Sequence, residues 1–531
     1  MGVHTIDYSK AKGQFSQFKD KPYRPGQEEA IHTITDNGRK VTVICAPTGS
    51  GKSVIGMVAG SLHARACYLC STKQLQHQLV HDFPEARYMV GRSNFKCNAD
   101  PNRTADLCIH TKATPCEFKP ACDYEVHKRE VLAHPLQILN YHYILNEANW
   151  VGTFSGYPLI ICDEADVLEG LLTGFIELRL SRTRLNTLGL NPPRYRTSSA
   201  KNGLVSWKTW AQEEGRVKVT SRLQELAEQT ATLRPHDAFT EDDMQAVREM
   251  RALEALYSRL NIFSTHMDDS WIFHEHKENG HIGGWVFQPT WLTPELAQEY
   301  FWKHGERFVL MSATFPPKVI LADMLGVRVG DIEYLELPST FPVSNRPVYL
   351  NPVADMSYKS FESELPKLLH EIERILAKHP HEKGLIHAVS WRLTNEIMAE
   401  LQDSRLIGHS DTSKDQQLAK FMRSKDGVFV SPSSTRGVDL PDDACRFIII
   451  AKAPFQSLGD KLVSSRVYGS GMGAFWYKAI CAQDIVQASG RGVRHKDDYC
   501  TTYLLDTQIE KLIVDSQGLF PRYWIEAVDY L

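Results

Sequence analysis

The chain has 531 residues and a formal net charge of −4 at pH 7, with 60 lysine and arginine residues against 64 aspartate and glutamate residues. This length allows roughly three to four domains, and the balanced charge excludes a general attraction to nucleic acid, so a nucleic-acid site has to be a local groove. We expect neither secretion nor a membrane span, because no signal-peptide core or long apolar run is present. The 11 cysteines then indicate reduced thiols or metal ligands, not disulfides.

Residues 23–27, Tyr-Arg-Pro-Gly-Gln, precede a predicted helix over residues 28–35. The amide of Gln27 can donate and accept hydrogen bonds along one edge of adenine, and Tyr23 offers a ring for stacking. A turn that starts a helix explains the same residues. Adenine recognition is therefore a hypothesis that stands beside a structural role.

A phosphate-binding loop is predicted between residues 46 and 53, after a β-branched strand over residues 41–44. The loop fits G-x-x-x-x-G-K-S, except that Ala46 occupies the first position. Its glycines let backbone N–H groups approach phosphates, Lys52 would reach the β- and γ-phosphates, and the Ser53 hydroxyl would bind Mg²⁺. The predicted nucleotide contacts here are Gln27, Pro47, Thr48, Gly49, Ser50, Gly51, Lys52 and Ser53.

The next strand is predicted over residues 67–70 and is followed by Ser-Thr-Lys-Gln-Leu at 71–75. Hydroxyls and a lysine at the carboxyl end of a strand suit contact with a phosphodiester backbone. A solvated loop explains them nearly as well.

A polar segment between residues 97 and 122 interrupts the α/β pattern, and it holds four cysteines: Cys97, Cys108, Cys116 and Cys122. Four thiols in a segment with little apolar core predict a metal centre that stabilises a small module. Such a set binds zinc or an iron–sulfur cluster. The absence of a C-x₂-C pair weakens the zinc interpretation without excluding it.

An apolar strand at residues 158–162 ends in Asp163-Glu164. In parallel sheets this position lies beside the phosphate-binding loop. Asp163 is predicted to hold Mg²⁺, directly or through water, and Glu164 to orient and deprotonate the attacking water.

Residues 171–300 lack the α/β pattern and contain long helical stretches, for example 217–233 and 240–260. Residues 271–287 predict a hairpin with an Asn279-Gly280 turn. We interpret the region as a helical domain inserted into the first α/β domain.

A buried strand resumes at residue 308 and ends in Ser312-Ala313-Thr314, and a turn-rich linker over 337–345 precedes a second β/α series. Strands are predicted at 384–388, 427–430 and 446–450, and helices at 361–378, 392–402 and 414–423. Gly437-Val438-Asp439 follows one of these strands. Gln487, Arg491 and Arg494 are predicted at helical spacing, with the two arginines stabilising charge on the transferring γ-phosphoryl group.

The order of these motifs resembles that of superfamily 2 helicases, in which two RecA-like domains close on ATP. The cysteine module and the helical insert make the chain similar to the XPD/DinG iron–sulfur helicases, over about residues 23–506. The resemblance implies that Gly437 and Asp439 contact the nucleotide, that the four cysteines bind a [4Fe–4S] cluster, and that the insert is the arch. It implies an α/β fold divided as follows: RecA-like domain 1 at 1–90, 151–172 and 301–340, the cysteine module at 91–150, the arch at 173–300, and RecA-like domain 2 at 341–531.

Three features depart from this family. Residues 163–166 spell Asp-Glu-Ala-Asp, where the family usually has a final histidine, and this invites comparison with DEAD-box RNA helicases. That class, however, has histidine where Gln487 stands and has no place for the cysteine module. The cysteine spacing is compact, and we expect no N-terminal nuclease because little chain precedes Tyr23.

We therefore expect an ATP-dependent DNA helicase or translocase, monomeric, with ATP and Mg²⁺ as cofactors and single-stranded DNA and duplex or hybrid junctions as partners. The family moves 5′→3′, which we expect here as well. We place the protein in the cytoplasm or wherever its DNA lies. The alternatives are a DNA-stimulated ATPase that remodels complexes without unwinding, and an RNA helicase.

Overall fold

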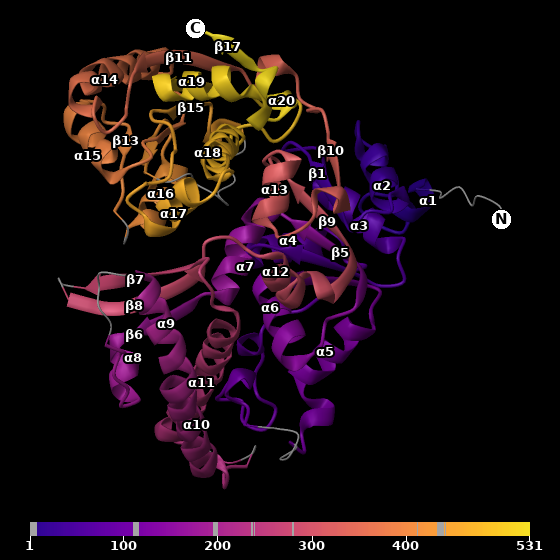
Figure 1. The fold of residues 1–531 in the computed structure, drawn as a ribbon. Helices are drawn as coiled ribbons and strands as arrows, with labels where there is room; N and C mark the ends of the chain where they lie inside the picture. The colour runs from indigo at the N-terminus through magenta and orange to yellow at the C-terminus, as the bar shows by residue number, and fades with distance from the viewer. Residues whose placement is uncertain are drawn as a thin grey trace. The chain divides into compact units, whose positions relative to one another are not determined.

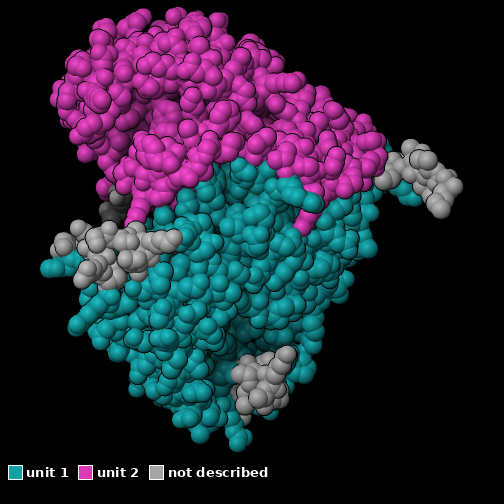
Figure 2. All heavy atoms as spheres, in the orientation of Figure 1, with its two compact units in different colours: residues 1–20, 57–308, 322–328 teal, residues 21–56, 309–321, 329–531 magenta. Residues whose placement is uncertain are grey.

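The computed structural model describes residues 8–109, 116–194, 200–234, 237, 239–278, 281–410, 413–432, 440 and 442–531. The chain forms two compact units, one of residues 1–20, 57–308 and 322–328 and the other of residues 21–56, 309–321 and 329–531 (Figure 2). In the described part of the chain, no helix has both the length and the apolar character needed to cross a membrane.

A seven-stranded sheet contains the predicted phosphate-binding strand, and its strand order is β10-β1-β9-β5-β2-β4-β3; β10, β1, β9 and β5 are labelled in Figure 1. β1 runs parallel to β10, and β2 runs parallel to β4 and β5. β1 and β2 are buried along their whole length, which explains why each is a continuous apolar run in the sequence. The strands are β1 Val41–Cys45, β2 Ala66–Cys70, β3 Arg87–Tyr88, β4 Leu136–Asn140, β5 Tyr157–Asp163, β9 Gly305–Ser312 and β10 Ile332–Glu336.

Helices connect the strands of this sheet. α3 begins at Lys52, directly after the phosphate-binding loop, and the N-terminus of α4 is capped by the Thr72 side chain, which accepts a hydrogen bond from the Leu75 N–H at 3.1 Å. Both helices therefore point N–H groups toward the carboxyl ends of the strands. The helices of this region are α1 Tyr8–Gly13, α2 Gln27–Asp36, α3 Lys52–Ser61, α4 Lys73–Asp82, α5 Asp123–Ala133, α6 Tyr141–Asn146, α7 Leu168–Ile176, α12 Pro294–Tyr300 and α13 Lys318–Met324.

The cysteine segment has little regular structure, as its composition predicts. Its described elements between β3 and α5 are three short 3₁₀ turns, Arg92–Asn94, Ala105–Leu107 and Lys119–Ala121, and one bridge between Lys96 and Thr104. β4 lies within residues 91–150 of the chain, yet it is a strand of the first sheet.

The insert contains the predicted helices, but it is not only helical. A three-stranded antiparallel sheet in the order β6-β8-β7 lies with them. The predicted hairpin is β7–β8, and its Asn279-Gly280 turn lies outside the described residues. The elements are β6 Leu178–Ser181, α8 Arg182–Thr187, α9 Ala200–Trp210, α10 Arg216–Thr230, α11 Glu241–His266, β7 Trp271–Glu278 and β8 His281–Pro289.

An aromatic core joins the two layers of the insert. The ring of Trp207 on α9 lies 5.1 Å from that of Trp285 and 5.0 Å from that of Phe287 on β8. α11 packs along α10 (Figure 1) and starts with a capping box, in which Thr240 and Asp243 exchange side-chain and backbone hydrogen bonds.

A second seven-stranded sheet has the order β13-β14-β12-β15-β16-β11-β17. Its described pairings are parallel, and α14 packs on it through an apolar stripe that includes Leu368, Ile372 and Ile375. The predicted strands and helices of this region are confirmed to within two residues at each end. The strands are β11 Val348–Ala354, β12 Gly384–His387, β13 Leu406–Ile407, β14 Val428–Ser431, β15 Phe447–Ile450, β16 Thr501–Asp506 and β17 Val528–Tyr530. The helices are α14 Phe361–Lys378, α15 Trp391–Glu400, α16 Lys414–Arg423, α17 Lys461–Gly469, α18 Gly473–Ser489, α19 Thr507–Ser516 and α20 Arg522–Ile525.

Candidate nucleotide site and cysteine module

The loop between β1 and α3 has a backbone that only glycine adopts without strain at two positions. Gly49 has φ +81° and Gly51 has φ +79°. A Cβ atom at Gly49 would lie 2.1 Å from the Phe341 ring, and one at Gly51 would lie 2.3 Å from Nε2 of Gln27. Conformation and space therefore both require glycine, as expected of a loop that wraps around phosphate groups.

Gln27 is buried against this loop. Its Nε2 donates to the Ser50 carbonyl at 2.9 Å, and its Oε1 accepts from the Arg24 N–H at 2.9 Å. The Arg24 guanidinium also donates to the Gly49 carbonyl. The Gln27 amide thus braces the phosphate-binding loop, a role that sequence reasoning did not foresee. Its predicted contact with adenine stays a prediction.

The polar side chains of the loop have few protein partners. Lys52 Nζ donates to the Ala46 carbonyl at 3.3 Å, within its own loop. The Ser50 hydroxyl is buried and has no hydrogen-bond partner in the described part of the chain. Buried polar groups are nearly always satisfied, so this hydroxyl fits a loop that closes on a ligand.

Asp163, the last residue of β5, is only 3% exposed. Its Oδ2 accepts a hydrogen bond from the Tyr68 hydroxyl at 2.8 Å, and its Oδ1 accepts one from the Glu164 N–H at 3.0 Å. Its backbone carbonyl accepts one from the Tyr141 hydroxyl at 2.9 Å. Donors on both oxygens hold the carboxylate in a fixed orientation, as a metal ligand requires.

Glu164 occupies the left-handed region, with φ 50°. Non-glycine residues are uncommon there, and such strain clusters at functional sites. The turn directs the Glu164 side chain away from the regular path of β5, and it remains partly exposed.

The Ser312-Ala313-Thr314 segment follows β9. The Ala46 N–H donates to the Ser312 carbonyl at 2.8 Å, and the Tyr523 hydroxyl donates to the Ala313 carbonyl at 2.9 Å. The buried Thr314 hydroxyl has no partner among the described residues. This segment is therefore fixed by its backbone, while one hydroxyl remains available.

The last motif only partly has the predicted helical spacing. Gln487 lies on α18, but that helix ends at Ser489, so Arg491 and Arg494 follow it in a non-helical turn. Two glycines, Gly490 and Gly492, lower helix propensity here, and a Cβ at Gly492 would lie 2.2 Å from the Cys500 sulfur.

The amide nitrogen of Gln487 is buried and has no partner in the described part of the chain. A bound ligand could accept a hydrogen bond from this amide nitrogen. Gly437 and Asp439 lie outside the described residues.

The four predicted cysteine ligands converge. Cys97, Cys108, Cys116 and Cys122 all line one cavity, and Arg92, Lys119 and Tyr124 complete part of its wall. Burial raises the pKa of the Cys116 thiol, and the charges of Cys108, Cys97 and Cys122 raise it further. The other seven cysteines are buried elsewhere in the fold. The polar segment therefore gathers four thiols separately from those of the apolar cores.

A cation lies beside these thiols. The Arg92 guanidinium stacks 4.9 Å from the centre of the Tyr124 ring. Burial acts to lower the pKa of Arg92, but the hydrogen bond to Tyr124 and the charges of Tyr124 and Cys108 raise it overall. Positive charge at this position offsets the negative charge of thiolates.

The insert contacts the cysteine module in two places. The Arg251 guanidinium on α11 donates to the Cys108 carbonyl at 3.0 Å. The Arg103 guanidinium, from the cysteine module, lies 3.7 Å from the centre of the Phe239 ring, a cation–π contact. These contacts join the cysteine module to the insert.

Known proteins resemble this chain in both halves. Residues 24–196 match the DEAD/DEAH box helicase family, and residues 372–526 match the helicase C-terminal domain family. A solved XPD helicase structure is similar to the whole chain, with a TM-score of 0.61, 15% identity and full coverage of both chains. The structure of S. tokodaii Xpd4 has a TM-score of 0.56 and 14% identity, covering 95% of this chain and 98% of that one.

A curated relative is the ATP-dependent DNA helicase CHL1 of Saccharomyces cerevisiae (strain YJM789). It is 22% identical over 259 residues, which cover 41% of this chain and 30% of CHL1. The chain is thus similar to DEAD/DEAH box helicases in its first part and to the helicase C-terminal domain family in its second, and its fold is similar to that of XPD structures.

The expected fold class is confirmed, since both large sheets are parallel, carry helices and match XPD structures in fold. The match spans less than a third of the length of CHL1.

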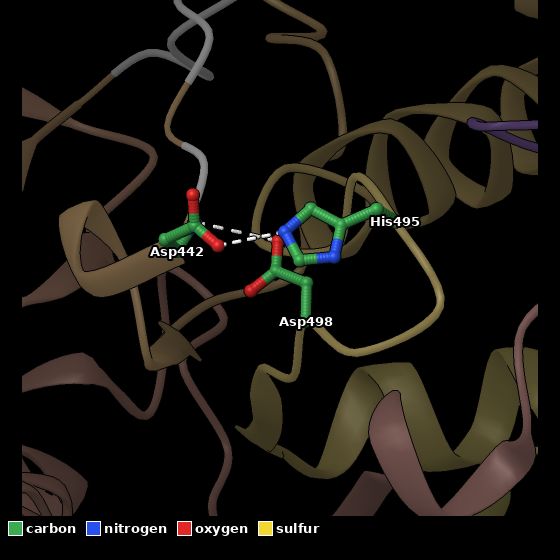
Figure 3. A group of neighbouring side chains, drawn as sticks. All are labelled: Asp442, His495 and Asp498. Carbon is green, nitrogen blue, oxygen red and sulfur yellow. Dashed lines mark hydrogen bonds and ion pairs between the residues drawn. The ribbon is translucent and has the colours of Figure 1, made fainter.

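Figure 3 shows a group that resembles a metal site in the second half of the chain: Asp442, His495 and Asp498. Asp498 is fully buried, and its Oδ1 accepts from the Arg446 guanidinium at 2.7 Å and from the Tyr499 N–H at 3.0 Å. Its Oδ2 accepts from backbone N–H groups of Arg494 at 3.0 Å and Asp442 at 3.4 Å.

The Asp498 carboxylate is thus committed to protein donors and fixes the turn that carries Arg494. His495 Nε2 and Asp442 Oδ1 are hydrogen-bonded at 2.7 Å between exposed side chains. The group is a structural clasp, and sequence reasoning missed it.

Replacing Asp498 by alanine should lower the free energy of unfolding by about 3 kcal/mol, because the Arg446 guanidinium would lose its buried partner. His495→Ala, which removes only the exposed hydrogen bond to Asp442, should change the free energy of unfolding by less than about 1 kcal/mol. Urea denaturation of the two variants measures both effects. Equal effects would contradict the clasp, and stabilisation of wild-type protein by added Mg²⁺ or Mn²⁺ without nucleotide would favour a metal site.

Proposed function

We propose that this chain is an ATP-dependent DNA helicase or translocase that moves 5′→3′ along single-stranded DNA. The observation that carries the proposal is the convergence of four thiols beside an inserted domain, in a chain that also has the phosphate-binding loop, Asp163-Glu164 and Gln487 in helicase order. The name of the relative CHL1 supports DNA as the nucleic acid.

Lys52 would bind the β- and γ-phosphates, which the loop amides also contact. Ser53 and Asp163 would hold Mg²⁺, which neutralises charge on the phosphates when bound. Glu164 would orient the attacking water and take its proton. Gln487, Arg491 and Arg494 would stabilise the charge of the transferring phosphoryl group, and Gly437 and Asp439 would contact the nucleotide.

Two substitutions separate nucleotide binding from chemistry. Lys52→Ala should weaken ATP binding and reduce turnover by at least ~100-fold, because it removes a cation from the phosphates. Glu164→Gln should reduce turnover by a similar factor or more but leave ATP binding intact, since the amide cannot accept the proton of water. DNA-stimulated phosphate release and equilibrium ATP binding measure the two effects. Near-normal turnover in Glu164→Gln would remove this residue from the proposed role.

We propose that Cys97, Cys108, Cys116 and Cys122 hold a [4Fe–4S] cluster. The convergence of the four thiols on one cavity and the resemblance to iron–sulfur helicases support this assignment.

Replacing Cys108 by serine should remove most of the iron and sulfide and impair DNA unwinding more than ATP binding, because the phosphate-binding loop lies in another part of the chain. Anaerobic purification, metal analysis and the visible absorption spectrum measure the first effect. Cys481→Ser is the matched control, since Cys481 is buried on α18, and it should keep its iron. Stoichiometric zinc without iron in the wild-type protein would overturn the cluster assignment.

The direction of movement along DNA would depend on the part of the protein that meets the duplex. The cysteine module interrupts the chain between the phosphate-binding loop and Asp163, and we propose that it acts as the wedge that separates the strands. Backbone charges and base stacking would supply the affinity, so binding should tolerate any sequence and weaken steeply with salt.

A duplex with a 5′ single-stranded DNA tail should be unwound at least ~10-fold faster than an otherwise identical duplex with a 3′ tail. Strand displacement followed by gel or fluorescence measures the rates, with an RNA-tailed duplex as a third substrate. Faster unwinding of the 3′-tailed duplex would contradict the polarity. Preference for the RNA tail would favour an RNA helicase, and ATP hydrolysis without any displacement would favour a remodelling ATPase.

A further inference from the structure

Two buried tyrosines hold Asp163, and neither is among the residues expected to contact ATP. Tyr68 lies on β2 and its hydroxyl donates to Oδ2 of Asp163 at 2.8 Å. Tyr141, the first residue of α6, donates to the backbone carbonyl of Asp163 at 2.9 Å. Both side chains are buried. The carboxylate and the backbone of one residue are therefore each held by a phenol.

The register of the sheet sets the first contact. Tyr68 stands opposite Ile161 in the parallel pairing of β2 with β5. Side chains alternate along a strand, so Asp163 lies on the same face as Ile161, one step closer to the carboxyl end. A long side chain reaches such a diagonal neighbour. The contact between Tyr68 and Asp163 thus follows from two regular strands and does not depend on a loop.

Both partners need the contact. A phenol buried in a central strand usually has a hydrogen-bond partner, and a buried carboxylate is stabilised by donors. Tyr68 and the Glu164 N–H donate to different oxygens of Asp163, which fixes the rotation of the carboxylate about its Cβ–Cγ bond. A carboxylate oxygen can accept more than one bond, so these contacts orient the group and still permit a metal or a metal-bound water.

We propose that Tyr68 and Tyr141 are positioning residues that hold the Asp163 carboxylate in the orientation in which it binds the Mg²⁺ of the nucleotide, directly or through water. The inference rests on the proposed role of Asp163 and adds the residues that prepare it. With the tyrosines in place, the metal–nucleotide complex meets an ordered ligand. Without the Tyr68 hydroxyl, the carboxylate has to be ordered during binding, and metal affinity falls.

The test is Tyr68→Phe, which keeps the ring and removes the donor. Mn²⁺ binding to the protein–ADP complex is measured by the loss of the free-ion electron paramagnetic resonance signal, and metal-free ADP binding by a fluorescent analogue. We expect Mn²⁺ binding to weaken roughly 10-fold, as for the loss of a hydrogen bond to a charged group, with metal-free ADP binding unchanged. Wild-type Mn²⁺ affinity in Tyr68→Phe would overturn the proposal.

Tyr157→Phe is the matched control. Tyr157 is equally buried, lies on β5 and donates to Oε1 of Gln137 at 2.5 Å, so its substitution also removes a buried hydrogen bond of the same sheet. Mn²⁺ affinity should stay at the wild-type value in this variant. Equal weakening in Tyr157→Phe and Tyr68→Phe would show a general loosening of the sheet and would overturn the proposal.

Two further variants complete the design. Tyr141→Phe should weaken Mn²⁺ binding in the same direction, and it provides the test if Tyr68→Phe does not fold. Asp163→Asn tests the proposed function separately: wild-type Mn²⁺ affinity in this variant would refute the metal role of Asp163 itself. Weakening in Asp163→Asn, with wild-type affinity in both tyrosine variants, would refute only the positioning role.

Discussion

The need to give buried carboxylates hydrogen-bond donors is the constraint on which much of this structure depends. A charged group without water is stable only when donors surround it, and three aspartates meet this condition in different ways. The Asp163 carboxylate accepts from the Tyr68 hydroxyl and the Glu164 N–H, and the Tyr141 hydroxyl holds the backbone carbonyl of the same residue. Asp498 uses Arg446 and three backbone N–H groups. Asp506, at the end of β16, accepts from the N–H groups of Met356, Ala453 and Gln508. Each carboxylate joins segments that are distant in sequence.

The same condition explains the different roles of these aspartates. All the hydrogen bonds described for Asp498 and Asp506 come from protein groups that tie loops together, so both act as scaffold. Burial raises the pKa of Asp506, although backbone hydrogen bonds act to lower it. Asp163 is followed by Glu164, and the turn at this point leaves the Glu164 side chain partly exposed. A carboxylate oriented by phenols can serve a ligand as well as the fold.

Sequence reasoning succeeded where local chemistry determines structure. The phosphate-binding loop, the strand before Asp163 and helices such as α14 and α16 could be predicted because glycine pattern, apolar runs and helical periodicity are local signals. It failed where the local signal is short or ambiguous. The helix that carries Gln487 ends at Ser489, before Gly490 and Gly492, so Arg491 and Arg494 do not continue its helical spacing. In the sheet of the insert, the hairpin β7–β8 was predicted but β6 was not, because β6 has only four residues.

The sequence gives a weaker signal for the positioning residues Tyr68 and Tyr141. A tyrosine in an otherwise apolar central strand, as at Tyr68, requires an acceptor, but the sequence does not say which strand supplies it. The order β5-β2-β4 supplies that information. The convergence of the four cysteines was predictable as a set, whereas the contact of Arg251 with the Cys108 carbonyl was not, because the two residues are 143 positions apart.

The left-handed backbone of Glu164 narrows the evolutionary paths open to this chain. At φ 50° a β-branched side chain is strained, while glycine, asparagine and aspartate adopt the conformation more readily. Water activation, in contrast, would require a carboxylate of sufficient reach. Glycine and asparagine meet the first demand but not the second, and aspartate supplies the carboxylate on a shorter arm. Drift at this position is therefore restricted twice, by the shape of the turn and by the chemistry it presents, so substitutions that relax the backbone would be selected against for a reason unrelated to folding.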